Sequence, residues 1–145
     1  MVQQSQGGFL IAKIHQISDR ILSRLLRENS IEINPAQGRI MFSLWNNDNL
    51  PIRELAKRTS LSKSSLTSML DRLEDAGYIH RVASSEDRRE VLIRRTEKDK
   101  SFWNRYILVS RQMTRIFYEG FEDTEIEMFE QYLERILKNV VRYDD

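Results

Sequence analysis

Residues 51–82 decide the fold, and they read PIRELAKRTSLSKSSLTSMLDRLEDAGYIHRV. Apolar residues at helical spacing predict a short helix over residues 51–59 and a second helix over residues 62–76, separated by a tight turn. Ser62 is placed to cap the second helix, because a serine oxygen accepts a hydrogen bond from the free amides of a helix start. Gly77 is placed to end it in a left-handed conformation. Two short helices joined by a turn predict a helix–turn–helix.

The residues after Gly77 change from helical to alternating periodicity. Residues 78–82 and 90–94 both alternate, and a polar, charged loop lies between them. This pattern predicts two short strands joined as a hairpin over residues 78–94. A hairpin directly after a helix–turn–helix predicts a winged helix, so we expect a mainly α fold with a small two- to three-stranded β-wing.

Long helices are predicted on both sides of this core. Residues 9–27 carry a broad apolar stripe, a second long helix follows Thr96, and a last one is expected to start with a capping box at Thr124–Glu127. A further helix is predicted to begin at Asn34-Pro35, with Gln37 completing its capping box. The outer helices carry more apolar positions than one small core requires.

We therefore expect residues 1–145 to form one domain. Residues 34–100 would be the winged-helix core, and residues 9–30 and 101–143 would be dimerisation helices.

The composition excludes several classes of function. The chain has 145 residues, of which 40% are hydrophobic and 31% charged, so a folded globular protein is expected. Because there is no cysteine, disulfides, thiolate metal sites and thiol nucleophiles are excluded. No apolar run approaches the roughly 18 residues of a membrane span, and no signal-peptide pattern opens the chain, which indicates a soluble cytoplasmic protein. No metal-ligand spacing, phosphate loop or nucleophile motif is present, so neither an enzyme nor a cofactor is expected.

The net charge of +1 conceals an uneven distribution, because basic and acidic residues are concentrated in different regions of the chain. Residues 51–100 contain 12 basic and 9 acidic residues, whereas residues 101–145 contain 6 basic and 9 acidic ones. The predicted winged helix is therefore the basic part of the chain. Such a distribution is typical of a protein that meets a polyanion with one face.

One face of the second helix is predicted to contact double-stranded DNA. At about 100° per residue, Leu70 and Leu73 lie within about 40° of Leu66 and form the inward side. The opposite side carries small hydroxyl residues, which let a helix approach the major groove closely and bond a base edge or a phosphate. The candidate residues of the helix and its approach are Arg53, Ser62, Lys63, Ser64, Ser65, Thr67, Ser68 and Arg72.

The loop of the hairpin supplies the second predicted contact. Asp87, Arg88 and Arg89 stand at its tip, and an arginine there is suited to the negative potential of a narrow minor groove. Asp87 is placed to hold Arg89 or a backbone amide of the turn. A solvated charged turn is the alternative for an isolated hairpin, but the preceding helix–turn–helix favours the DNA contact.

The chain resembles the MarR family of winged-helix transcription regulators over nearly its whole length. The stretches that carry the resemblance are IRELA at 52–56, SLTSMLDRLEDAGYI at 65–79, DRR at 87–89, VLI at 91–93 and TEK at 96–98. The resemblance implies a homodimer whose terminal helices interlock and whose two wings and recognition helices address a pseudo-palindromic operator. It also implies a role in regulation, with a repressor expected. The alternative is a winged-helix adaptor that binds a protein through the same surface, although the polar wing tip favours DNA.

Two residues depart from the family pattern. Ser68 stands where the family often has arginine, so a direct arginine–guanine contact from that position is excluded. Asp99 stands where the family usually has glycine. We expect this change to be harmless or mildly stabilising, because an acid suits the start of a helix.

The resemblance further implies release of DNA by a small aromatic or anionic effector bound beside the dimerisation helices. Each candidate residue has two interpretations: it lines an effector pocket, or it is an ordinary part of the core. Aromatic and methionine side chains at helical spacing are more often core residues. His15 is expected to be satisfied by a neighbouring carbonyl or carboxylate more often than by a ligand. The absence of cysteine excludes the peroxide-sensing branch of the family. The candidates are His15, Met41, Trp45, Phe102 and Tyr106.

Overall fold

A computed structural model describes residues 5–144. Its elements in chain order are α1 (Gly7–Glu28), α2 (Pro35–Asn46), β1 (Leu50–Pro51), α3 (Ile52–Thr59), α4 (Lys63–Asp75), β2 (Ile79–Ala83), β3 (Val91–Arg95), α5 (Glu97–Phe117) and α6 (Asp123–Val141). The expected mainly α fold with a small β-wing is confirmed. The chain forms two compact units, one ending at Val109 and the other beginning at Ser110, and α5 runs across the division.

Side-chain caps fix the starts of α2 and α4. The Asn34 carboxamide oxygen accepts from the Gln37 amide at 2.8 Å, and the Gln37 carboxamide oxygen accepts from the Asn34 amide at 2.8 Å. This is the capping box predicted for α2. Ser62 Oγ accepts from the Ser65 amide at 3.2 Å, so the predicted start of α4 is also confirmed.

Gly77 makes the sharp turn that connects α4 to the wing. Its φ of +87° lies in the left-handed region, which glycine adopts without the steric cost that other residues meet. The Thr96 hydroxyl donates to the Gly77 carbonyl at 2.5 Å and accepts from the Asp99 amide at 3.2 Å. Thr96 therefore caps α5 and at the same time holds the turn between α4 and β2.

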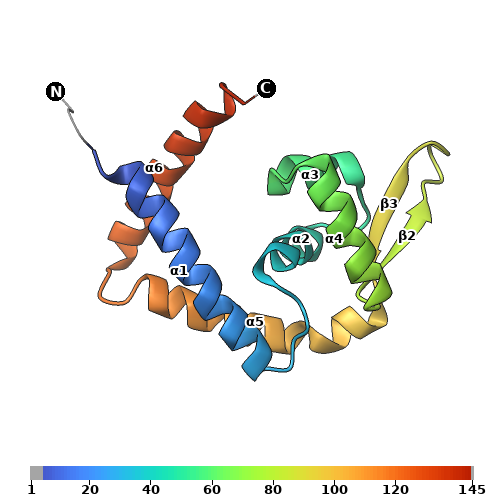
Figure 1. Cartoon of the computed structure of the whole chain (residues 1–145), viewed down its shortest axis with the longest axis horizontal. Helices are drawn as coiled ribbons and strands as arrows, with labels where there is room; N and C mark the ends of the chain where they lie inside the picture. Colours follow the sequence, from blue (N-terminus) through green and yellow to red (C-terminus); the bar gives the residue numbers. More distant parts are fainter. Residues whose placement is uncertain (1–4, 145) are drawn as a thin grey trace. The chain divides into compact units, whose positions relative to one another are not determined.

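The wing is part of a three-stranded antiparallel sheet with the order β1-β3-β2. Arg81 of β2 pairs with Ile93 of β3, and on the other side of β3 Leu50 of β1 pairs with the same Ile93. Pro51 is tolerated in β1 because this strand lies at an edge of the sheet. Figure 1 shows the long β2–β3 hairpin beside α4.

The core of the first unit joins the helix–turn–helix to α2 and the sheet. Its fully buried side chains come from α2, α3, α4 and both strands of the wing, and α4 contributes the three leucines predicted for its inward side. These buried residues include Ile40, Met41, Leu44, Leu55, Leu66, Leu70, Leu73, Ile79 and Ile93. The opposite side of α4 is therefore left exposed.

The start of α6 differs from the prediction. Glu122 is the N-cap residue, and its amide donates to the Glu125 carboxylate at 2.9 Å. The capping box predicted at Thr124–Glu127 is thus wrong by two residues, because Glu122 and Glu125 have the same spacing and α6 already begins at Asp123. Sequence alone does not choose between Glu122 and Thr124 as the N-cap residue, because each is followed by a glutamate three positions later.

Large apolar side chains are exposed on the outer helices of each unit. α6 has no buried residue, although it carries Met128, Tyr132, Ile136, Leu137, Val140 and Val141, all of which are exposed. In the first unit, α1 exposes Phe9, Leu10, Ile11, Ile14 and Ile17. None of the helices in the described part of the chain is long and apolar enough to cross a membrane.

Candidate nucleic-acid interface

The exposed side of α4 is built from short polar side chains. Lys63, Ser64, Ser65, Thr67 and Ser68 are all exposed. The Thr67 hydroxyl donates to the Lys63 carbonyl at 2.9 Å, so its oxygen keeps accepting capacity. Lys63, Ser64, Thr67 and Ser68 also line an open hollow of about 710 Å³. This surface combines short hydrogen-bonding groups with one cation, as contact with a base edge or a phosphate requires.

Asp71 is the fifth residue that lines this hollow, and it forms an ion pair with Arg81. Arg81 of β2 lies 2.8 Å from Asp71 Oδ1 and 2.6 Å from Glu74 Oε1, and its backbone amide donates to Glu74 at 3.1 Å. Hydrogen bonds from Arg81 hold the pKa of Glu74 below its ordinary value. Arg81 therefore partly neutralises two acids of α4 and fastens this helix to the wing. No pattern in the sequence predicted this contact, which joins residues on either side of the Gly77 turn.

The loop at the tip of the wing has a defined conformation. Ser84 is buried, and its Oγ accepts from the amides of Glu86 at 3.2 Å and Asp87 at 3.3 Å. Asp87 Oδ1 accepts from the Arg89 amide at 3.0 Å and lies 3.4 Å from Arg89 Nε. Both contacts proposed for Asp87, to the arginine and to a turn amide, are present. The side chain of Arg89 is nevertheless 92% exposed, and Arg88 is exposed as well.

Three elements bring cations to one hollow between the helix–turn–helix and the wing. Arg53 of α3, Lys63 of α4 and Arg89 of the wing loop line this space, whose volume is about 790 Å³. Asp87 and Glu90 line it too, and Glu90 lies 2.9 Å from Arg53. The structure thus gathers predicted contact residues that are 10 to 36 positions apart in the chain. Arg72 is exposed in the last turn of α4, outside the two hollows.

The predicted effector residues lie in different environments. Met41 is fully buried and Tyr106 is buried, and Trp45 packs against Tyr106 with ring centroids 4.6 Å apart. Phe102 is half-buried and lies 6.2 Å from the ring of Tyr78. His15 is exposed on α1, where its Nε2 is 3.4 Å from Asp19. The structure therefore joins Trp45 with Tyr106, and it gives His15 the carboxylate partner that the sequence suggested as the commoner case.

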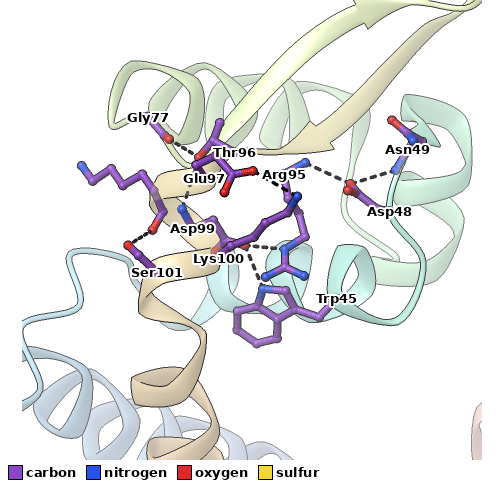
Figure 2. Close-up of polar contacts among 11 residues, drawn as sticks. Trp45, Asp48, Asn49, Gly77, Arg95, Thr96, Glu97, Asp99, Lys100 and Ser101 are labelled. Atoms are coloured by element: carbon purple, nitrogen blue, oxygen red, sulfur yellow. Dashed lines mark hydrogen bonds and ion pairs between the residues drawn. The ribbon is translucent and has the colours of Figure 1, made fainter.

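Asp99 is the residue whose environment differs most from expectation. It stands in the first turn of α5 as predicted, but it is fully buried and bonds both Arg95 and Trp45. Figure 2 shows these side chains converging on its carboxylate. The expected place of this acid at a helix start is confirmed, whereas its burial and its bonds to Arg95 and Trp45 were not predicted. The sequence offered only the i, i+4 spacing of Arg95 and Asp99 as a sign of the pair.

Metal ligation finds no support in the described residues. Between residues 5 and 144, no group of three or more His, Asp or Glu side chains is arranged to hold a metal ion. The surface formed by α4 and the wing loop offers cationic side chains and hydrogen-bonding groups.

Comparison with known proteins places this geometry among regulators. The model of the MarR family matches residues 33–91, which cover α2 to the start of β3. The multiple antibiotic resistance protein MarR of Escherichia coli is 28% identical over 131 residues, which are 90% of this chain and 90% of that protein. The uncharacterized regulator YfiV of Bacillus subtilis is 33% identical over 73 residues, or 50% of this chain and 46% of that protein.

A solved structure extends the similarity to the whole fold. The crystal structure of a mutant of MarR from E. coli complexed with operator DNA is similar with a TM-score of 0.79 and 27% identity. The match covers 90% of this chain and 92% of that chain. The similarity therefore includes the outer helices as well as the winged helix.

Proposed function

We propose that this chain is a member of the MarR family and a sequence-specific DNA-binding transcription regulator that acts as a homodimer. Because the family consists of transcription regulators, the chain is not an enzyme. One observation carries the proposal: the exposed hydroxyl side of α4 and the cations Arg53, Lys63 and Arg89 share one surface.

The proposed complex uses the two parts of that surface differently. α4 enters the major groove, where Ser64, Thr67 and Ser68 are short enough to let the helix backbone approach the bases. Arg89 and Arg88 at the wing tip reach the adjacent minor groove or the phosphates, where the negative potential is greatest. Ser62, Ser65 and Arg72, which stand at the start and end of α4, are proposed to contact the backbone of the duplex.

A homodimer is supported by the apolar side chains that the described chain leaves exposed. The outer helices α1 and α6 together expose more large apolar residues than isolated soluble chains usually carry, and such faces mark interfaces. In a two-fold dimer each winged helix addresses one half-site, so the operator is proposed to be a pseudo-palindrome with half-sites about one helical turn apart.

We further propose that the regulator is a repressor whose DNA is released by a small aromatic or anionic effector. The support for this part is the family resemblance. Trp45 and Tyr106, whose ring centroids lie 4.6 Å apart, are proposed to contact the effector, and Met41, Phe102 and His15 complete the proposed set. Calorimetry with salicylate as probe, with and without bound duplex, tests this part separately.

Selection from a random duplex pool tests the main proposal. We expect enrichment of a pseudo-palindromic sequence by the wild-type chain, and a binding constant that falls steeply as salt rises, because cations on the protein displace counterions from the duplex. A chain in which Arg88 and Arg89 are replaced by alanine is expected to lose affinity for every sequence. Replacement of both Arg135 and Lys138 in α6 by alanine removes the same two charges and serves as the control. Absence of duplex binding at low salt would refute the proposal and favour the adaptor alternative.

A further inference from the structure

A polar cluster holds the base of the wing, at the end of β3 opposite the loop. The Arg95 backbone amide donates to Asp48 Oδ1 at 2.9 Å, and the same oxygen accepts from the Asn49 amide at 2.9 Å. The Asn49 carboxamide oxygen in turn accepts from Arg94 Nε at 2.7 Å. The turn between α2 and β1 is thereby bonded to the last two residues of β3. Figure 2 shows the contacts of Asp48 with Asn49 and Arg95. We name this group, with Asp99 and Trp45, the wing-base cluster.

Asp99 connects the wing-base cluster to α5. Its Oδ2 accepts from Arg95 Nε at 2.5 Å and from the indole of Trp45 at 3.2 Å. The Asp99 side chain is fully buried and that of Arg95 is 15% exposed. One carboxylate oxygen therefore joins three elements: the end of β3, the last turns of α2 and the first turn of α5.

Stability alone is a poor explanation for this carboxylate. Removing a charge pair from water costs more than the pair usually returns, and an apolar packing of the same volume is commonly as stable. The second oxygen of Asp99 adds to this cost, because Oδ1 is also buried away from water. What a buried pair supplies better than an apolar contact is a fixed geometry between the elements that carry its partners.

The geometry fixed here is the direction of the wing. From Arg95 to Val91 the strand β3 extends about 13 Å, at about 3.3 Å per residue, and Arg89 lies two residues beyond its end in the loop. A rotation of about 10° at the base would therefore move the tip by about 3 Å, which is enough to take an arginine out of hydrogen-bond reach. A small movement of Arg95 is thus amplified at the residues proposed to touch DNA, while α4 stays in place through Leu66, Leu70 and Leu73.

We propose that Asp99 is a positioning residue for DNA binding: by holding Arg95 at the base of the wing, it sets the direction of the wing relative to α4 together with the bonds of Arg81 to Asp71 and Glu74. The effect of Asp99 on DNA binding rests on the proposed function. Its effect on the direction of the wing does not, because that direction is measurable without DNA.

The first experiment measures that direction directly. The chain has no cysteine, so cysteines introduced at Ser85 in the wing loop and at Asp75 at the end of α4 would be its sole thiol labelling sites. Spin labels at both positions, diluted with unlabelled protein so that one labelled protomer is present per dimer, give the distance by pulsed EPR. We expect one narrow distribution with Asp99 present, and a shifted or broadened one after Asp99→Asn. Identical distributions would overturn the proposal whether or not the chain binds DNA.

The second experiment asks whether the wing alone depends on Asp99. Arg89→Ala and Thr67→Ala are each made with Asp99 and with Asp99→Asn, and dissociation constants are measured on the selected duplex. We expect Arg89→Ala to weaken binding about tenfold in the parent and less than about threefold in the Asp99→Asn background, because a misdirected wing has little contact left to lose. Thr67→Ala should cost the same factor in both backgrounds.

Equal losses for Arg89→Ala in the two backgrounds, or a parallel fall in the effect of Thr67→Ala, would overturn the proposal. The fold of each variant is checked by fluorescence, since both tryptophans of the chain, Trp45 and Trp103, lie at this cluster with ring centroids 4.9 Å apart. If Asp99→Asn fails to fold, Arg95→Lys takes its place, because lysine keeps the charge but lacks the fixed fork of arginine. Failure of the parent chain to bind any duplex would refute the proposed function alone, and the EPR measurement would still decide the role of Asp99.

Discussion

Arg53 of α3 lies 2.9 Å from the carboxylate of Glu90 in the wing, although the Arg53 side chain is 79% exposed. An exposed cation on the proposed DNA surface is thus held by an acid of the same surface. Exposed ion pairs contribute only about 0 to 1 kcal/mol, so a phosphate competes easily with Glu90 for this arginine. The pair therefore limits the charge that the free protein presents to DNA.

Glu90→Gln is expected to strengthen DNA binding. The substitution removes a negative charge from the surface and leaves Arg53 available to a phosphate, so the slope of log affinity against log salt should steepen by about 0.9, the value for one more neutralised phosphate. Fluorescence anisotropy with the selected duplex at several salt concentrations measures both quantities. Glu97→Gln removes the same charge from the first turn of α5, where the side chain is 91% exposed, and this control should change neither quantity. An unchanged slope for Glu90→Gln would show that Arg53 is not released to a phosphate.

Arg89→Ala is expected to weaken binding to all duplexes by a similar factor. Arg89 is 92% exposed at the wing tip and restrained only by Asp87, so it is free to contact the sugar–phosphate backbone or the minor groove. The salt slope should become shallower by about 0.9. Titration of a matched and a scrambled duplex checks this, with Lys138→Ala in α6 as control. A loss confined to the matched duplex would instead indicate that Arg89 reads bases.

Thr67→Ala is expected to alter preference more than overall affinity. Thr67 carries a hydroxyl that already donates to Lys63 and a methyl group that suits a thymine methyl. Loss of one base contact should cost about 1–3 kcal/mol on the selected sequence and almost nothing on a scrambled one. Equal losses on both sequences would assign Thr67 to the backbone of the duplex.

Local signals in the sequence were sufficient for most of the fold. The capping residues Asn34 and Ser62 and the left-handed Gly77 act within four positions of themselves, so their roles follow from neighbouring residues. β1 has only two residues, so no alternating pattern can reveal it. It forms because its residues pair with the edge of β3. The start of α6 was misplaced because acids at 122 and 125 compete with Thr124 for the cap.

The candidate site was less accessible to sequence reasoning than the fold. Exposure of Lys63, Thr67 and Ser68 followed from the helical period, because the leucines of α4 define its inward side. The pairing of Arg53 with Glu90, and the clamp of Arg81 on Asp71, depend on how the wing folds back on the helices, which no local pattern encodes. The burial of Asp99 depends on Trp45, 54 positions away.

The pH dependence of stability should reveal the buried state of Asp99. Burial raises the pKa of Asp99 above its ordinary value of 3.8, although the hydrogen bond and charge of Arg95 oppose the shift. The folded chain therefore takes up this proton more readily than the unfolded chain does. The contribution of Asp99 to the free energy of unfolding should rise as the pH falls toward 3.8, stay constant below it, and be lost as the pH rises through the folded-state pKa.

Asp99→Asn isolates this effect because it removes one titrating group and leaves the other carboxylates unchanged. Urea unfolding of both chains across the acidic range gives the difference between their free energies of unfolding. We expect that difference to move in favour of the wild-type chain as the pH is lowered. A difference that is flat, or that moves in favour of Asp99→Asn, would contradict a raised pKa.

Leu137→Glu in α6 is expected to separate the proposed dimer without unfolding the winged helix. Leu137 is 56% exposed in the single chain, beside the exposed Ile136, Val140 and Val141. Burial of one leucine contributes about 1.5–3 kcal/mol, and a two-fold interface contains each position twice, so the dimer dissociation constant should rise by about 10²- to 10⁴-fold. Sedimentation equilibrium measures this constant, and circular dichroism checks the fold. Gln131→Glu adds the same charge to α6 without removing an apolar group, and its dimer should persist. A Leu137→Glu chain that dimerises as the parent does would place the interface elsewhere and leave the apolar side of α6 unexplained by self-association.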